Sequence, residues 1–304
     1  MTLDEYMTFD ATGLAALVAA GEVTPAELLD LARQRMREVN PTLNAVVIET
    51  RAEADDQVRR NLSGPFAGVP FLLKDLEQQY RGYPTTSGCR ALRDVVENQN
   101  ALVTDRFLDA GLVILGKTNT PELGAKGITE PDLWGPCRNP WDTRRTPGGS
   151  SGGSASAVAA GIVPAAGAND GGGSIRIPAA TTGLVGLKTS RGRTPYGPHS
   201  GELMFGMVTQ GVVSRTVRDS AGLLDAIGGP NQFADYPMTS SARSFVDAIG
   251  DRPGRLRIGY SGRSAIRGEP TAEAAAALED TAQLLTDLGH HVEEVVPPYD
   301  DKAL

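Results

Sequence analysis

The sequence predicts an α/β fold whose sheet is largely buried. Short apolar runs, typical of buried strands, alternate along the chain with segments whose apolar residues recur at helical spacing. The chain has 304 residues, 40% of them hydrophobic and 22% charged, which is enough for one large globular domain or two ordinary ones. We therefore expect alternating strands and helices, with most strands shielded from water.

Each element follows from a local pattern. Residues 1–40 predict two helices, and the second begins with a capping box of Thr24 and Glu27 with Pro25 at the first helical position. Further helices are expected at residues 51–60, 100–110, 154–160, 175–182, 217–227 and 270–288. Strands are expected at residues 44–49, 68–73, 112–115, 162–168, 256–260 and 291–296.

Composition disfavours several classes of function. The net charge of −8 argues against nucleic-acid binding, and the longest weakly polar run, residues 157–168, is too short to span a membrane. Two cysteines, Cys89 and Cys137, form no disulfide framework, and the acidic start resembles no signal peptide, so a cytoplasmic location is expected. No group of His, Cys and carboxylate residues has metal-ligand spacing, so we expect no metal and no cofactor.

Two motif matches are rejected on their context. Residues 111–118 fit the phosphate-loop pattern GxxxxGK[ST], but the four middle residues read as a strand, which cannot wrap a phosphate. Residues 148–152 fit the nucleophile elbow GxSxG, but the segment before them is a loop rather than a strand. The chain offers only His199, His290 and His291 as histidine bases, all in segments typical of the surface.

Ser174 is a candidate nucleophile because it follows Gly171, Gly172 and Gly173 directly. Consecutive glycine amides can point into one small concavity and stabilise an oxyanion. The alternative interpretation is a serine that only caps the next helix. Asp170 and Arg176 flank this segment; they either pair and hold the loop or remain separate surface charges.

Lys74 is the candidate base. It follows the apolar run Val69–Leu73, so a buried amine is expected there. Burial disfavours the charged form of lysine and lowers its pKa toward neutrality, as a base requires. The alternative is a lysine that ends a strand with its ammonium group in water.

Taken together, these segments resemble the amidase signature family. The resemblance rests on Lys74, on residues 148–154, and on residues 170–178, with Ser174 placed 24 positions after Ser150. It extends from about Leu14 to the end of the chain. The segments GPFAGVPFLLKDL, TEPDLWGPCRNPWD and NDGGGSIRIPA are most similar to the branch that contains aminohexanoate cyclic-dimer hydrolase.

The resemblance implies a fold, namely a mixed central sheet covered by helices on both faces, with the helical segment 1–40 as part of one amidase domain spanning residues 1–304. The family is usually longer than this chain, so we expect its C-terminal part to be missing and the activity of the chain as given is left open. In the family pattern Asn169 is often Thr or Ser. A small-molecule amide is the expected partner, and a homodimer is left open.

The resemblance also implies roles for individual residues. Ser174 would be the nucleophile, Lys74 the base, and Ser150, after a cis peptide bond, the proton relay between them. The oxyanion hole would be formed by the amides of Gly171, Gly172, Gly173 and Ser174. Ser151, Asp170 and Arg176 would support the catalytic residues. The acyl pocket would be lined by Gly127, Ile128 and Thr129.

The implied activity is hydrolysis of a linear carboxylic amide to a carboxylate and ammonia or an amine. Two alternatives stay open. One is the amidase subunit of a tRNA-dependent amidotransferase, which is disfavoured because Thr129 and Glu130 precede Pro131 where the resemblance leads us to expect asparagine. The other is a protein of the same fold whose triad is idle.

Overall fold

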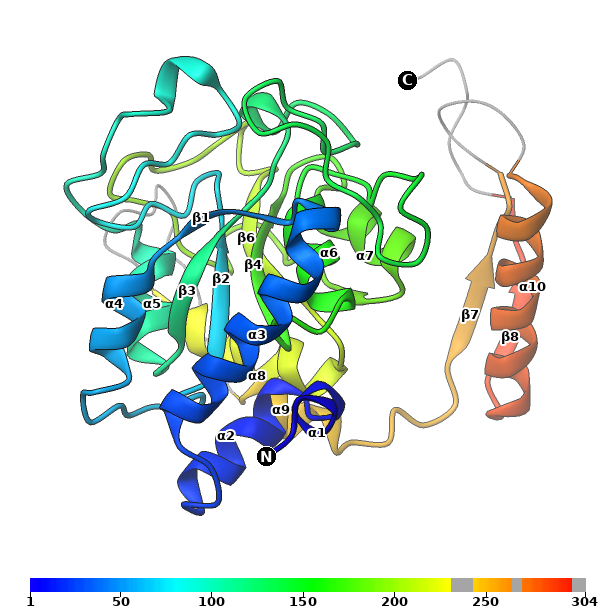
Figure 1. Ribbon diagram of the computed structural model, residues 1–304. Helices are drawn as coiled ribbons and strands as arrows, with labels where there is room; N and C mark the ends of the chain where they lie inside the picture. The colour runs from blue at the N-terminus through cyan, green and yellow to red at the C-terminus, as the bar shows by residue number, and fades with distance from the viewer. Residues whose placement is uncertain (231–242, 264–269, 297–304) are drawn as a thin grey trace. The chain divides into compact units, whose positions relative to one another are not determined.

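The computed structural model describes residues 1–230, 243–263 and 270–296, which fall into two compact units, Met1–Ile249 and Gly250–Leu304 (Figure 1). The single amidase domain over residues 1–304 remains a prediction, and residues 231–242, 264–269 and 297–304 of it lie outside the described part. In that part, no helix is long and apolar enough to cross a membrane.

The larger unit is built on a mixed sheet, six-stranded within the described residues, with the order β1-β3-β2-β4-β6-β5. Its central strands β3, β2 and β4 run parallel, while β1 at one edge and β6 and β5 at the other are antiparallel to their neighbours. The strands are β1 (Val46–Glu49), β2 (Pro70–Lys74), β3 (Val113–Thr118), β4 (Ala165–Asp170), β5 (Val185–Gly186) and β6 (Thr209–Ser214).

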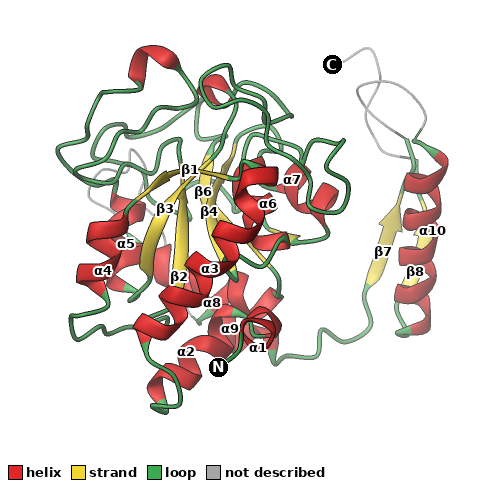
Figure 2. Ribbon diagram, in the orientation of Figure 1, coloured by secondary structure: helices red, strands yellow, loops and turns green. Residues whose placement is uncertain are grey.

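Helices cover both faces of this sheet, as expected. Helix α6 (Gly152–Ala159) and helix α3 (Pro25–Leu43) pack on the central strands from the side facing the viewer, and α8 (Val217–Ile227) packs from the other side (Figure 2). Every residue of β2, β3 and β4 is buried, which explains why these strands begin with apolar or small residues. Their carboxyl ends are polar, with Lys74 in β2, Lys117 in β3 and Asn169 and Asp170 in β4. The remaining helices of the unit are α4 (Arg51–Gln57), α5 (Leu102–Asp109), α7 (Arg176–Thr182) and α9 (Phe245–Ile249), with short 3-10 helices η1 (Arg90–Leu92) and η2 (Glu122–Gly124).

The N-terminal segment corrects one expectation. Residues 1–43, all of them described, form three helices rather than two: α1 (Leu3–Thr8), α2 (Ala11–Ala19) and α3. The break comes at Asp10, whose carboxylate accepts a hydrogen bond from the amide of Gly13 at 2.9 Å and so begins a new helix. The capping box at Thr24 and Glu27 is present as expected.

Strand β6 was missed by the sequence analysis. Its residues, TQGVVS, are polar or small at four of six positions, although all six are buried between β4 and β5. An apolar run is therefore a sufficient sign of a buried strand but not a necessary one. The strand matters for the site because it pairs along the whole of β4, from Ala165 to Asp170.

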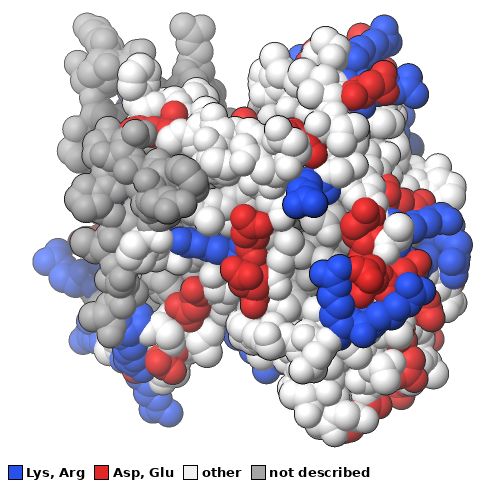
Figure 3. All heavy atoms as spheres, turned by 90° about the vertical axis from the view of Figure 1, so that its left-hand side faces the viewer, with Lys and Arg blue, Asp and Glu red and all other residues white. Residues whose placement is uncertain are grey.

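The smaller unit is a strand-helix-strand element, as expected. Strands β7 (Arg257–Tyr260) and β8 (His291–Glu294) pair in parallel, and α10 (Ala272–Asp287) connects them in the chain. On the face of the molecule in Figure 3, acidic and basic side chains are interspersed, with a formal net charge of −8 for the whole chain.

Candidate active site

Lys74 lies at the carboxyl end of β2 and is fully buried. Its Nζ is 2.7 Å from Ser150 Oγ and 2.7 Å from Asn169 Oδ1. Burial lowers the pKa of Lys74 to about 7, although the negative charges of Asp170 and Glu77 act in the opposite direction. The alternative of a lysine head in water is therefore wrong, and at neutral pH a large fraction of this amine is uncharged.

Ser150 lies in the loop before α6 and is 1% exposed. The peptide bond from Gly149 to Ser150 is cis, as the resemblance implied. A Cβ on Gly149 would lie 2.8 Å from the backbone nitrogen of Ile128, so only glycine fits this position. The carbonyl of Ser150 accepts a hydrogen bond from Thr120 Oγ1 at 3.0 Å, which fixes the serine from the other side.

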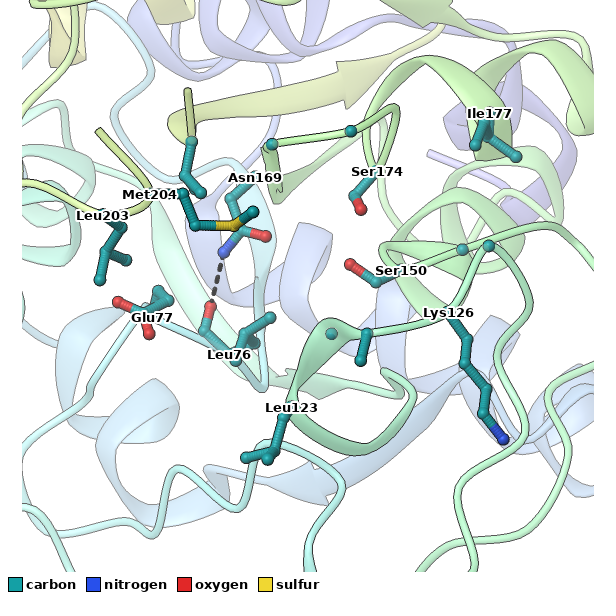
Figure 4. Close-up of a pocket in the computed structure, with 17 residues that line it drawn as sticks. Leu76, Glu77, Leu123, Lys126, Ser150, Asn169, Ser174, Ile177, Leu203 and Met204 are labelled. Carbon is teal, nitrogen blue, oxygen red and sulfur yellow. Dashed lines mark hydrogen bonds between the residues drawn. The ribbon is translucent and has the colours of Figure 1, made fainter. Parts of the chain in front are cut away.

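Ser174 lies in the loop between β4 and α7 and is partly exposed to a cavity. Its side chain and that of Ser150 point toward one another across the edge of this cavity (Figure 4). The amide of Ser151 donates a hydrogen bond to the carbonyl of Ser174 at 3.2 Å, which joins the two serine loops. Lys74, Ser150 and Ser174 thus follow one another in space, from the buried sheet to the open cavity.

The glycine loop differs from expectation at one position. The amide of Gly173 donates to Asp170 Oδ1 at 2.7 Å, so it is turned away from an oxyanion. For the amides of Gly171, Gly172 and Ser174, the described residues provide no acceptor, and all three residues line the cavity. A Cβ on Gly172 would meet nothing within 4 Å, which places that residue on open space.

Asp170 and Arg176 hold this loop in place. Arg176 Nε and Nη2 each lie 2.9 Å from the buried carboxylate of Asp170, so the alternative of two separate surface charges is wrong. Burial alone would raise the pKa of Asp170, but hydrogen bonds from Arg176 and from the amides of Ile175, Gly173 and Arg176 outweigh it and lower the pKa to about 2. The carboxylate is therefore charged at neutral pH and fixes both ends of the loop.

The expected acyl-pocket residues separate into two groups. Gly127 lines the cavity, whereas Ile128 and Thr129 do not. The backbone of Ile128 packs on Gly149, and the residue as a whole is 41% exposed. The hydroxyl of buried Thr129 donates to the carbonyl of Gly148 at 2.8 Å. Both residues contact Gly148 or Gly149, which directly precede Ser150.

The cavity has a volume of about 520 Å³, which is in the range of small-molecule sites. Much of its wall is apolar, and the serine hydroxyls, Asn169 and Glu77 are polar groups on it (Figure 4). The apolar side chains of this wall are those of Leu76, Leu123, Ala125, Ile177, Leu203, Met204 and Val208.

Sequence reasoning gave no role to Asn169 or Glu77. Asn169 precedes Asp170 in β4, and its amide group donates to the carbonyl of Leu76 at 3.0 Å while its oxygen accepts from Lys74. The sequence could have suggested the contact between Asn169 and Lys74, because neighbouring parallel strands such as β2 and β4 bring their carboxyl ends together. Glu77 comes three residues after Lys74.

The two rejected motifs are rejected by the structure as well. Residues 113–118 of the phosphate-loop match form β3, in which Lys117 is fully buried and lies 3.1 Å from Asp75. Ser150 has no strand directly before it. His199 is 4.0 Å from Glu97 and is not among the residues that line the cavity beside Ser150 and Ser174. Across the described ranges, no three His, Cys, Asp or Glu side chains are grouped as a metal site.

Comparison with known families identifies this architecture. The profile of the Amidase family matches residues 27–304. The chain belongs to the amidase signature family. The mixed sheet with helices on both faces is therefore the amidase-signature fold, as the sequence predicted.

Amidase-signature relatives cover nearly all of this chain. It is 40% identical over 297 residues to 6-aminohexanoate-cyclic-dimer hydrolase of Paenarthrobacter ureafaciens, a match that covers 95% of this chain and 59% of the relative. It is 38% identical to an acylamidase of Rhodococcus erythropolis, covering 98% and 64%. The solved structure of 6-aminohexanoate cyclic dimer hydrolase superposes with a TM-score of 0.91 at 40% identity, covering 96% of this chain and 61% of that one. The branch suggested by the sequence is confirmed, and the chain spans about three fifths of these relatives.

Proposed function

We propose that this chain is a serine hydrolase that cleaves a carboxylic amide through an acyl-enzyme on Ser174. The observation that carries the proposal is the amine of Lys74, which is fully buried, has a pKa of about 7 and lies 2.7 Å from Ser150 Oγ. A buried uncharged amine beside a serine hydroxyl can serve as a base without histidine.

The acylation step follows from this arrangement. Neutral Lys74 takes the proton of Ser150 while Ser150 takes the proton of Ser174, whose oxygen attacks the amide carbonyl carbon. The carbonyl oxygen gains the negative charge, and the free amides of Gly171, Gly172 and Ser174 stabilise it. Lys74 then returns the proton through Ser150 to the leaving nitrogen, and the C–N bond breaks. The proton of Ser174 thus leaves with the amine, while Lys74 and Ser150 return to their starting states.

Deacylation uses the same groups. Water attacks the ester carbon and gives a proton to Ser150, which passes its own proton to Lys74. When the ester C–O bond breaks, the proton returns through Ser150 to the oxygen of Ser174, and the released acid ionises to the carboxylate in solvent. Asp170 and Arg176 keep the oxyanion loop in shape throughout but do not touch the reacting atoms.

The substrate is proposed only as a class. A linear amide is the expectation from the sequence, and the relative named as an acylamidase supports an acyl amide as the substrate. The relative named for a cyclic dimer of 6-aminohexanoate supports a cyclic amide equally well, so both belong in the substrate panel. A small amide is the proposed partner, with the cytoplasm as the proposed compartment and a homodimer as an open proposal for assembly.

A fluorophosphonate probe, which labels activated serines, tests the nucleophile. We expect labelling of the purified chain and none of the Ser174→Ala variant, while Ser150→Ala slows labelling severely. Labelling that persists in Ser174→Ala would refute the assignment. Release of ammonia or amine from a panel of linear and cyclic amides by the chain without partners would argue against the amidotransferase alternative, and an unlabelled but folded protein would support an idle triad.

A further inference from the structure

The carboxylate of Glu77 lines the same cavity as the serines, on the side opposite to them. In Figure 4, Glu77 lies beside Leu203 and Met204, whereas Ser150 and Ser174 lie across the cavity. The wall between the two sides is largely apolar. The cavity thus has a reactive end and an acidic end joined by a surface that suits an alkyl chain.

Within the described residues, the Glu77 carboxylate has no hydrogen bond and no ion pair; only its backbone carbonyl accepts a long contact, from Gln210 Nε2 at 3.5 Å. Burial raises the pKa of Glu77, while the positive charges of Lys74 and His199 lower it. Lys126 also lines the cavity, but its side chain points away from Glu77 (Figure 4). A half-buried carboxylate that lacks a partner is costly unless a ligand provides the positive charge.

The backbone around Glu77 is held in an uncommon conformation. Glu77 has a φ of 62°, in the left-handed region that non-glycine residues seldom adopt. Its neighbours are anchored: the carbonyl of Leu76 accepts from Asn169 at 3.0 Å, and the side-chain oxygen of Gln78 accepts from the amide of Lys74 at 2.7 Å. Backbone strain of this kind clusters at functional sites, where the surrounding structure maintains it.

Of the two cavities that Glu77 borders among the described residues, the one lined by the serines has room for a counter-ion. Glu77 also borders a second cavity, beside Tyr196 and His199, but that space measures about 10 Å³ and holds no more than one water. The cavity lined by the serines, at about 520 Å³, has room for an organic cation.

We propose that Glu77 binds an ammonium group of the substrate, so that the preferred amides carry a primary amine on an alkyl arm. This inference rests on the proposed amidase function, and it names a substrate class for that site. The arm lies along the apolar wall, the ammonium group meets Glu77, and the amide carbonyl reaches Ser174. Amides with a carboxylate at the same position are repelled.

The test compares 6-aminohexanamide with hexanamide, and with shorter and longer pairs of the same kind. We expect kcat/KM to be at least about tenfold higher for the best aminoalkanamide than for its neutral partner, a preference that weakens with added salt. In Glu77→Gln the ratio of the two kcat/KM values should fall to about one. Glu122→Gln removes an exposed charge from the neighbouring η2 segment as a matched control, and its ratio should stay at the wild-type value.

A ratio near one in the wild-type chain, or one that survives in Glu77→Gln, overturns the inference while leaving amide hydrolysis intact. Absence of both amide hydrolysis and fluorophosphonate labelling would instead reject the proposed function. A binding measurement separates the two: calorimetric titration of 6-aminohexanamide into Ser174→Ala should show binding that weakens about tenfold when Glu77→Gln is added. Equal binding to both variants overturns the role of Glu77 whatever the turnover.

Discussion

The central sheet buries two lysines on neighbouring strands, and the two differ in the charge of the groups that they contact. Lys74 ends β2 and Lys117 lies in β3, and both are fully buried, with burial lowering the pKa of each. Lys117 has a carboxylate 3.1 Å away, that of Asp75. Lys74 is hydrogen-bonded to neutral oxygens, those of Ser150 and Asn169.

The pair of Lys117 and Asp75 is tied into the surrounding loop. Lys117 Nζ also donates to the carbonyl of Pro84 at 2.8 Å and to Thr85 Oγ1 at 2.7 Å, while Asp75 accepts from both the amide and the hydroxyl of Thr86. A buried charge with a counter-ion and satisfied hydrogen bonds holds structure together. A buried amine with neutral partners loses its proton easily and can act as a base. The comparison teaches that the partner, rather than burial, separates the two roles.

The largest expected effect is on Lys74. Lys74→Ala removes the proposed base, so we expect fluorophosphonate labelling of folded protein to slow by at least about 100-fold. Labelling rates are normalised to the folded fraction from circular dichroism. The matched variant is Lys117→Ala: if its folded fraction is labelled as slowly as Lys74→Ala, the proposed division between base and structural charge fails.

The second prediction concerns stability. Asp75→Asn leaves the ammonium of Lys117 buried without its counter-ion, and we expect the free energy of unfolding to fall by about 3–5 kcal/mol in urea denaturation. The paired replacement Asp75→Leu with Lys117→Met should recover most of this loss, because no charge stays buried alone. Asp142→Asn, which removes the partly buried partner of the exposed Arg144, serves as a control with little effect expected. Equal unfolding midpoints for Asp75→Asn and Asp142→Asn would contradict the structural role.

Much of the site could be predicted from the sequence because its signals are local. The apolar run before Lys74 implied a buried amine, and the sequence of residues 170–178 implied a structured loop whose ends, Asp170 and Arg176, do pair. These inferences need only neighbours along the chain. The resemblance added Ser150, which no local pattern could have joined to Lys74.

The rest depends on contacts that the sequence does not encode locally. The Gly173 amide faces Asp170 because of the exact path of the loop, so a run of glycines in the sequence does not say which amides point into the cavity. Thr129 and Ile128 were placed in the pocket by analogy, but their roles depend on which side of the chain faces Gly149. Asn169 meets Lys74 only because β2 and β4 are neighbours in the sheet.

The third prediction concerns a substitution that gives Lys74 a carboxylate neighbour like that of Lys117. Lys74 must be uncharged to act, so the labelling rate of the wild-type chain should rise with pH through an inflection near 7 and level off above it. Asn169→Asp places a carboxylate beside Nζ, which stabilises the ammonium and raises the pKa of Lys74. We expect the inflection to move up by more than about one pH unit, with the rate at pH 7 falling about tenfold and recovering at alkaline pH. An unmoved inflection in folded protein would show that the partner does not set the pKa of Lys74.

The smallest expected effect comes from Asn169→Thr, which keeps Lys74 without a counter-ion. A neutral amine has two N–H groups and one lone pair, and the lone pair must face the hydroxyl of Ser150. Asn169 suits this need because its nitrogen is occupied by the carbonyl of Leu76, so its oxygen, which only accepts, faces Lys74. A threonine hydroxyl can also donate and so compete for the lone pair. We expect labelling above the inflection to slow by roughly two- to fivefold, a cost on the order of 1 kcal/mol, with the inflection itself almost unchanged. A rate equal to or above the wild-type value would show that charge alone, and not the direction of the hydrogen bond, distinguishes Lys74 from Lys117.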